Sequence, residues 1–176
     1  MTERDTIERV KARQGIVSKL QNLLLGGFAT KEDLRELDKQ LRDAHYDAFR
    51  DMRQTWEAVY LTALEVDAQL PQRDLKRVLQ TLDRVMARIR RADYGYAGLW
   101  DRKGQINETE LARVFNFDKV FSQDVAGLEA AVEKTQQDVE EEDWTAARTD
   151  LKQVVKLLRD LDDKWSERET LFRPLM

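Results

Sequence analysis

The stretch LRELDKQLRDAHYDAFRDMRQTWEAVYLTALEV, residues 34–66, decides the fold class of this chain. Its apolar residues recur at steps of three and four, which is the spacing of one buried stripe along an α-helix. The stripe consists of Leu34, Leu37, Leu41, Ala44, Ala48, Met52, Trp56, Val59, Ala63 and Val66. It predicts one long amphipathic helix over about residues 30–68.

Residues that break helices are scarce in the rest of the chain. Its 176 residues include only two prolines and seven glycines. Two adjacent glycines, Gly26 and Gly27, are expected to end a first helix over residues 2–25, because glycine readily adopts the left-handed cap conformation. We therefore predict an all-α protein, an antiparallel bundle of about five helices in one domain over residues 1–176.

Two similar segments raise the possibility of an internal duplication. DLKRVLQTLDRV at residues 74–85 and DLKQVVKLLRDL at residues 150–161 share five of twelve residues. Such matches also arise by convergence between amphipathic helices, so both explanations stay open. The duplication would divide the chain into two helical hairpins, residues 30–92 and 107–172, preceded by the first helix.

Composition excludes several classes of protein. The chain has no cysteine, so it can form neither a disulfide nor a thiolate metal site. The longest run without a polar side chain, Leu23 to Ala29, is far shorter than the roughly 20 residues that span a membrane. The charged N-terminus does not resemble a signal peptide. We therefore expect a cytoplasmic protein that does not interact with membranes.

Candidates for catalysis are few. His45 is the only histidine, and the helical spacing places it on the apolar side of its helix. We interpret it as a histidine at the edge of the core that has a hydrogen-bond partner. A pairing with a serine stays open, although no nucleophile motif is present. We assign no catalytic residue, metal ligand or cofactor, and we favour a protein that is not an enzyme.

Three aspartates, Asp43, Asp47 and Asp51, repeat at a spacing of four residues within the long helix. Carboxylates at this spacing repel one another unless a cation lies between them. A divalent cation held with carboxylates of a second helix would make the protein a metal-dependent hydrolase. The alternative, which we favour, is a solvated acidic face opposite the apolar stripe.

The clearest functional signal is a line of arginines after Pro71. Arg73, Arg77, Arg84, Arg88 and Arg91 fall within about a 60° arc when a helix turns by 100° per residue. No acidic residue interrupts this arc, and the apolar residues lie opposite it. Three aromatic residues, Tyr94, Tyr96 and Trp100, follow in a glycine-containing segment. These eight residues are the predicted site for an anion or a partner.

The chemistry of arginine limits what this site could bind. Its planar guanidinium suits carboxylates and phosphates, so an acidic protein partner is one candidate. Basic side chains beside aromatic rings can also bind single-stranded nucleic acid. Residues 73–103 contain nine basic and four acidic residues within a chain of net charge −4. Solvent-facing arginines without a function are the third possibility.

We expect a non-enzymatic interaction or scaffold protein. The predicted long helix is longer than the helix that follows it, so that helix alone would not cover its apolar stripe. The acidic face of the long helix also complements the arginine line in charge. Both features predict a homo-oligomer that salt weakens. A nucleic-acid-binding protein that uses residues 73–103 is the first alternative, and the metal-dependent hydrolase is the second.

Overall fold

A computed structural model describes residues 3–26, 30–66, 70–92 and 108–171. All regular structure in these ranges is helical, which confirms the predicted all-α class. The helices are α1 (Glu3–Gly26), α2 (Lys31–Glu65), α3 (Gln72–Arg91), α4 (Glu108–Glu140) and α5 (Trp144–Leu171).

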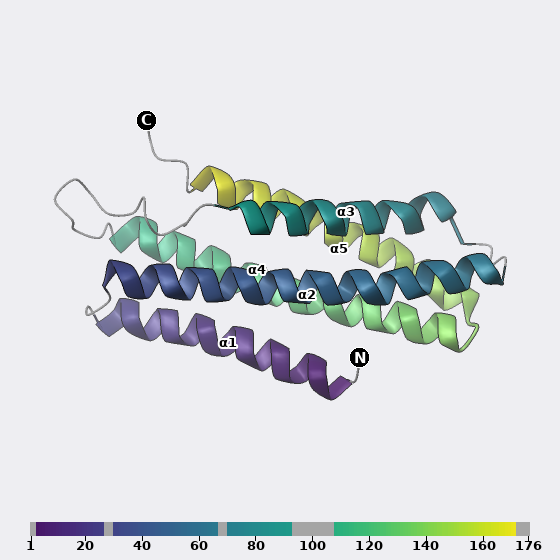
Figure 1. Ribbon diagram of the computed structural model, residues 1–176, viewed down its shortest axis with the longest axis horizontal. Helices are drawn as coiled ribbons and strands as arrows, with labels where there is room; N and C mark the ends of the chain where they lie inside the picture. The colour runs from purple at the N-terminus through teal and green to yellow at the C-terminus, as the bar shows by residue number, and fades with distance from the viewer. Residues whose placement is uncertain (1–2, 27–29, 67–69, 93–107, 172–176) are drawn as a thin grey trace.

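The helices form an elongated bundle (Figure 1). The hairpins α2–α3 and α4–α5 are each antiparallel, and they pack side by side so that α2 lies along α4 and α3 lies along α5. The helix α1 packs against α2 and α4 on the outside of this group. The helix α2 therefore has three neighbours.

Local sequence explains where the helices begin and end. The Thr30 side chain accepts a hydrogen bond from the Asp33 backbone, and the Asp33 carboxylate accepts one from the Thr30 backbone. This capping box satisfies two amides that the first turn of α2 leaves without partners. Between α4 and α5, Glu142 has a φ of 60°, and the Asp143 carboxylate accepts a hydrogen bond from the Ala146 amide.

The core is continuous across α2, α3, α4 and α5. Its largest fully buried side chains include Trp56, Phe49, Phe121 and Trp165. The indole nitrogen of Trp56 donates a hydrogen bond of 3.0 Å to the carbonyl of Leu75, which joins α2 to α3. A buried indole N–H without an acceptor would be costly, so this bond lets a large apolar ring occupy the centre of the bundle.

The length of α2 has a different consequence from the one expected. It has 35 residues, but α4 has 33 and runs alongside it. Most of the apolar stripe, from Leu37 to Ala63, is consequently buried within one chain. The apolar stripe of α2 is therefore no longer an argument for a homo-oligomer. The prediction of a homo-oligomer now depends only on the charged surfaces.

Candidate functional site

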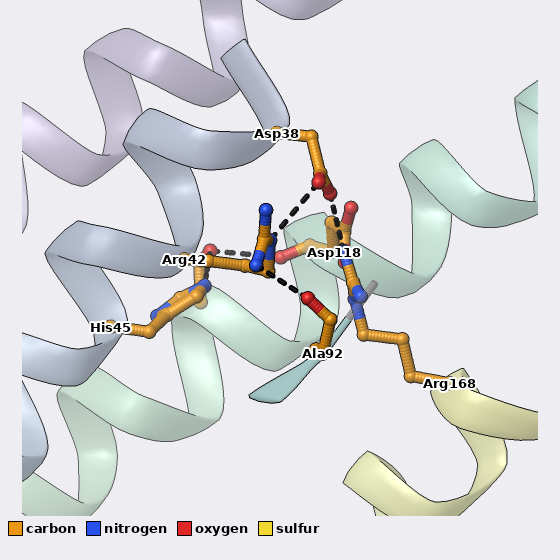
Figure 2. A network of polar contacts seen from close by, with 7 residues as sticks. Asp38, Arg42, His45, Ala92, Asp118 and Arg168 are labelled. Atoms are coloured by element: carbon orange, nitrogen blue, oxygen red, sulfur yellow. Dashed lines mark hydrogen bonds and ion pairs between the residues drawn. The ribbon is translucent and has the colours of Figure 1, made fainter. Parts of the chain in front are cut away.

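Four of the helices meet at a buried network of ion pairs (Figure 2). Arg168 of α5 donates hydrogen bonds to Asp38 of α2 at 2.7 Å and to Asp118 of α4 at 3.0 Å. All three side chains are at most 3% exposed. The Arg168 guanidinium also lies 4.9 Å from the ring centre of Trp165. One cation thus holds carboxylates from two other helices.

Arg42 extends the network to the end of α3. It donates to Asp38 at 3.0 Å and to the carbonyl of Ala92 at 2.8 Å. That carbonyl belongs to the cap residue of α3, where helix carbonyls lack partners within the helix. The network therefore fixes the register of four helices, and sequence patterns did not reveal it because Asp38 and Arg168 look like ordinary surface charges.

A second buried pair attaches α1 to the bundle. Arg13 of α1 and Glu129 of α4 form a two-pronged ion pair, and each side chain is 3% exposed. Arginine suits such a contact because its planar fork matches both carboxylate oxygens. Removing either partner would leave a charge in a poorly solvated place.

His45 lies in the core, on the apolar side of α2, as the sequence predicted. Its side chain packs edge-on against the ring of Phe121, with 5.1 Å between ring centres. Its Nε2 lies 3.4 Å from the Ser122 hydroxyl oxygen. Burial first, and then the nearby Arg13 and Arg168, lower its pKa well below 6.5. The imidazole is therefore neutral at pH 7.

The hydrogen-bond directions do not favour a catalytic Ser–His pair. The Ser122 hydroxyl donates its proton to the carbonyl of Asp118 at 2.8 Å. Its lone pairs then remain for an N–H of His45, which makes the histidine a donor rather than a base. The other ring nitrogen, Nδ1, is buried and has no hydrogen-bond partner among the described residues, so none of these orients the ring as the third member of a triad would.

The carboxylates of α2 lie differently from the expected solvated face. Asp43 and Asp47 are exposed, and Asp47 pairs with Arg50 at 2.9 Å. Asp51 is only 8% exposed, which corrects its placement on the outer face. The reason is that α2 packs against α1, α3 and α4, so little of its circumference faces solvent. Among the described residues, no cluster of three potential ligands could hold a metal ion.

The predicted arginine line divides into two parts. Arg73, Arg77 and Arg91 are exposed. Arg84 and Arg88 instead contact Asp162 of α5, at 2.6 and 2.7 Å, and Arg88 also donates to the Ser166 hydroxyl at 2.9 Å. The three predicted aromatic residues, Tyr94, Tyr96 and Trp100, lie outside the described residues.

This arrangement shows that the arginine line, although opposite the apolar face, does not face solvent along its whole length. The apolar face of α3 was identified correctly, since Leu75, Val78, Leu82, Val85 and Ile89 are buried. However, α5 lies along one edge of the arc, and a long arginine side chain can reach across that edge. The acidic partner for two of the arginines is thus within the same chain.

The edge between α3 and α5 carries a shallow hollow of about 40 Å³. We call it the α3/α5 basic groove. It is lined by Arg77 and Arg84 of α3 and Arg159 of α5, together with Val78, Thr81, Val155 and Leu158. Lys152 is also exposed and precedes Arg159 by seven residues, which places it on the same face of α5. Cations of two helices therefore border one hollow.

Sequence reasoning did not identify the contribution of α5. No acidic residue lies between Lys152 and Arg159, but Asp150 and Asp160 flank this basic segment, so it does not stand out as a line of like charge. The seven-residue spacing was the available signal. This spacing indicates a shared helix face, but only the packing of α5 beside α3 places that face at the groove.

Comparisons with known proteins add no relative. No protein-family model matches the sequence, and no curated protein or solved structure is significantly similar to it. None of the described helices combines the length and the apolar character that a membrane span requires.

Proposed function

We propose that this protein is a non-enzymatic interaction protein that binds an acidic segment of a partner protein through the α3/α5 basic groove. The observation that carries the proposal is the convergence of the exposed Arg77 and Arg159 on one hollow, beside Arg84, which already pairs with Asp162. Arginine pairs with carboxylates in a directional, often bidentate way, so two exposed arginines beside a hollow favour a carboxylate ligand. A cytoplasmic location belongs to the same proposal.

The size and floor of the groove favour a protein ligand over a nucleic acid. A hollow of about 40 Å³ accommodates a small group such as one carboxylate. Its floor includes Val78, Val155 and Leu158, which can contact the methylene groups of a glutamate side chain. Stacking platforms for bases would come from residues 94–100, which lie outside the described residues, so nucleic acid is an alternative outcome of the test.

Self-association is compatible with this proposal. The exposed acidic residues of α2, such as Asp43 and Asp47, could serve as the acidic segment in a second copy of the chain. Charge complementarity alone supports this form of the proposal, and it predicts an association that weakens as salt is added. Light scattering at low and high salt measures it directly.

The decisive experiment reverses charge in the groove. The double variant Arg77→Glu/Arg159→Glu changes two exposed side chains, so the fold should be retained. A matched control, Lys39→Glu/Arg113→Glu, makes the same change in net charge at exposed positions outside the groove. Binding of a fluorescein-labelled glutamate-rich peptide and of a single-stranded oligonucleotide is measured by fluorescence anisotropy at several salt concentrations.

We expect the groove variant to bind the peptide at least about tenfold more weakly, which corresponds to about 1.4 kcal/mol. The control should bind it as the wild type does. Equal weakening in both variants would indicate a general charge effect and would contradict a specific groove. Loss of oligonucleotide binding with unchanged peptide binding would favour the nucleic-acid alternative.

A further inference from the structure

A separate hollow of about 290 Å³ lies between α1 and α4, outside the α3/α5 basic groove. Its lining includes Arg13 and Val17 from α1, and Lys119, Ser122 and Ala126 from α4. Its volume is just below the range for small-molecule sites, about 300–1,000 Å³. A ligand that filled it would therefore be small.

Buried polar groups line this hollow. The side chain of Arg13 uses its two terminal nitrogens for Glu129, and its buried Nε has no acceptor in the part of the chain that the structure describes. Ser122, which is 7% exposed, also lines the hollow. Buried donors in proteins nearly always have an acceptor, so the Arg13 Nε favours a ligand that brings an oxygen atom.

The charges around the hollow favour an anion with a single charge. The Arg13 charge is balanced by Glu129 in the buried ion pair. Lys119 is exposed at the rim, and no carboxylate among the described residues pairs with it. One uncompensated cation attracts a monoanion, whereas a phosphate dianion would require more positive charge.

Apolar side chains complete the lining. Val10 and Val17 of α1 and Ala126 of α4 provide hydrocarbon surface beside the polar groups. Ligand sites typically combine such surface with a few fixed polar groups that orient the ligand. From these contacts we propose that the α1/α4 hollow binds a small organic monocarboxylate with a short hydrocarbon body.

The bound carboxylate would lie between Lys119 and the Arg13 Nε, and its hydrocarbon body would contact Val17 and Ala126. Charge-assisted hydrogen bonds would give the preference for an anion. The small ligand and the partly open site predict a modest affinity, with a Kd of about a millimolar for a six-carbon acid. This inference does not depend on the proposed function of the α3/α5 basic groove.

The single histidine of the chain provides a local probe for the test. Its Nε2 lies 3.4 Å from the hydroxyl of Ser122, which lines the hollow. Titration with hexanoate should therefore shift the NMR signals of the ring nitrogen and carbon atoms of His45 in a saturable way. Hexanamide, which has the same length and no charge, should bind at least about tenfold more weakly.

Three variants locate the site. Lys119→Gln should weaken hexanoate binding about tenfold, and Lys119→Arg should preserve it. Ala126→Leu should occupy part of the hollow and abolish the shift. Lys156→Gln, at an exposed position on α5, is the control and should behave as the wild type.

Two results would overturn the proposal. One is the absence of a saturable His45 shift with hexanoate, and the other is equal binding of hexanoate by the wild type and Lys119→Gln. The groove variant Arg77→Glu/Arg159→Glu should still bind hexanoate normally. Its loss of binding would place the carboxylate in the α3/α5 basic groove and would also contradict the proposal. If Ala126→Leu does not fold, the two Lys119 variants decide the outcome.

Discussion

Replacing Arg168 with methionine should destabilise the bundle more than any change of a surface arginine. Methionine retains most of the apolar stem and removes the guanidinium. Asp38 and Asp118 would each lose a buried hydrogen-bonded cation, at 0% and 3% side-chain exposure. Breaking a buried ion pair by removing one partner typically costs about 3–5 kcal/mol, because the remaining charge is poorly solvated.

The structure explains why the cost should reach that range. Asp38 loses the guanidinium of Arg168 but keeps the ion pair with Arg42 at 3.0 Å, so its charge remains partly compensated. Asp118 loses the guanidinium that lies 3.0 Å away, while the ring of Trp165 loses its cation at 4.9 Å. A loss of about 3 kcal/mol would lower the Tm of a chain of this size by about 6–12 °C.

Urea unfolding followed by circular dichroism measures this effect directly, and Arg159→Met is the matched control. Arg159 is exposed, so its replacement should change the free energy of unfolding by less than about 0.5 kcal/mol. The double variant Arg168→Met/Asp118→Leu should recover much of the loss, because it also removes the buried carboxylate of Asp118 that Arg168 compensates, while Asp38 keeps its ion pair with Arg42. If Arg168→Met unfolds at the same urea concentration as Arg159→Met, the network does not stabilise the fold as argued.

Two further predictions concern stability. Because burial lowers the pKa of His45, the folded protein binds fewer protons than the unfolded chain below about pH 6.5. The histidine's contribution is therefore fully present above pH 6.5, and falling pH should reduce it by up to about 1.4 kcal/mol per unit. His45→Gln should retain the fold and any binding at pH 7 and should lack this part of the pH dependence. A similar slope in denaturant melts of both proteins would contradict the assignment. Thr30→Ala should remove the capping box of α2 and cost about 1 kcal/mol in urea unfolding, whereas an unchanged midpoint would show that the cap contributes little.

The helical class could be predicted from local sequence because helix formation and termination depend on near neighbours. Steps of three and four along α2 predicted that Leu41, Met52 and Trp56 are buried, and the structure confirms this. The same reasoning placed His45 on the apolar side. Such patterns report which face of a helix is apolar, but they do not report which helix covers it.

Tertiary structure alone decided the partners of the charged residues. Arg168 and Asp38 are 130 positions apart, and no local pattern distinguishes them from surface charges. Likewise, the arginines of α3 formed a recognisable line, whereas Arg159 joined their groove only because α5 packs alongside α3. An ion pair or a groove between helices depends on long-range packing, and its energy depends on burial that packing creates. The sequence by itself therefore determined the helices and their apolar faces, and the packing of those helices determined which charges became a buried network and which remained available for binding.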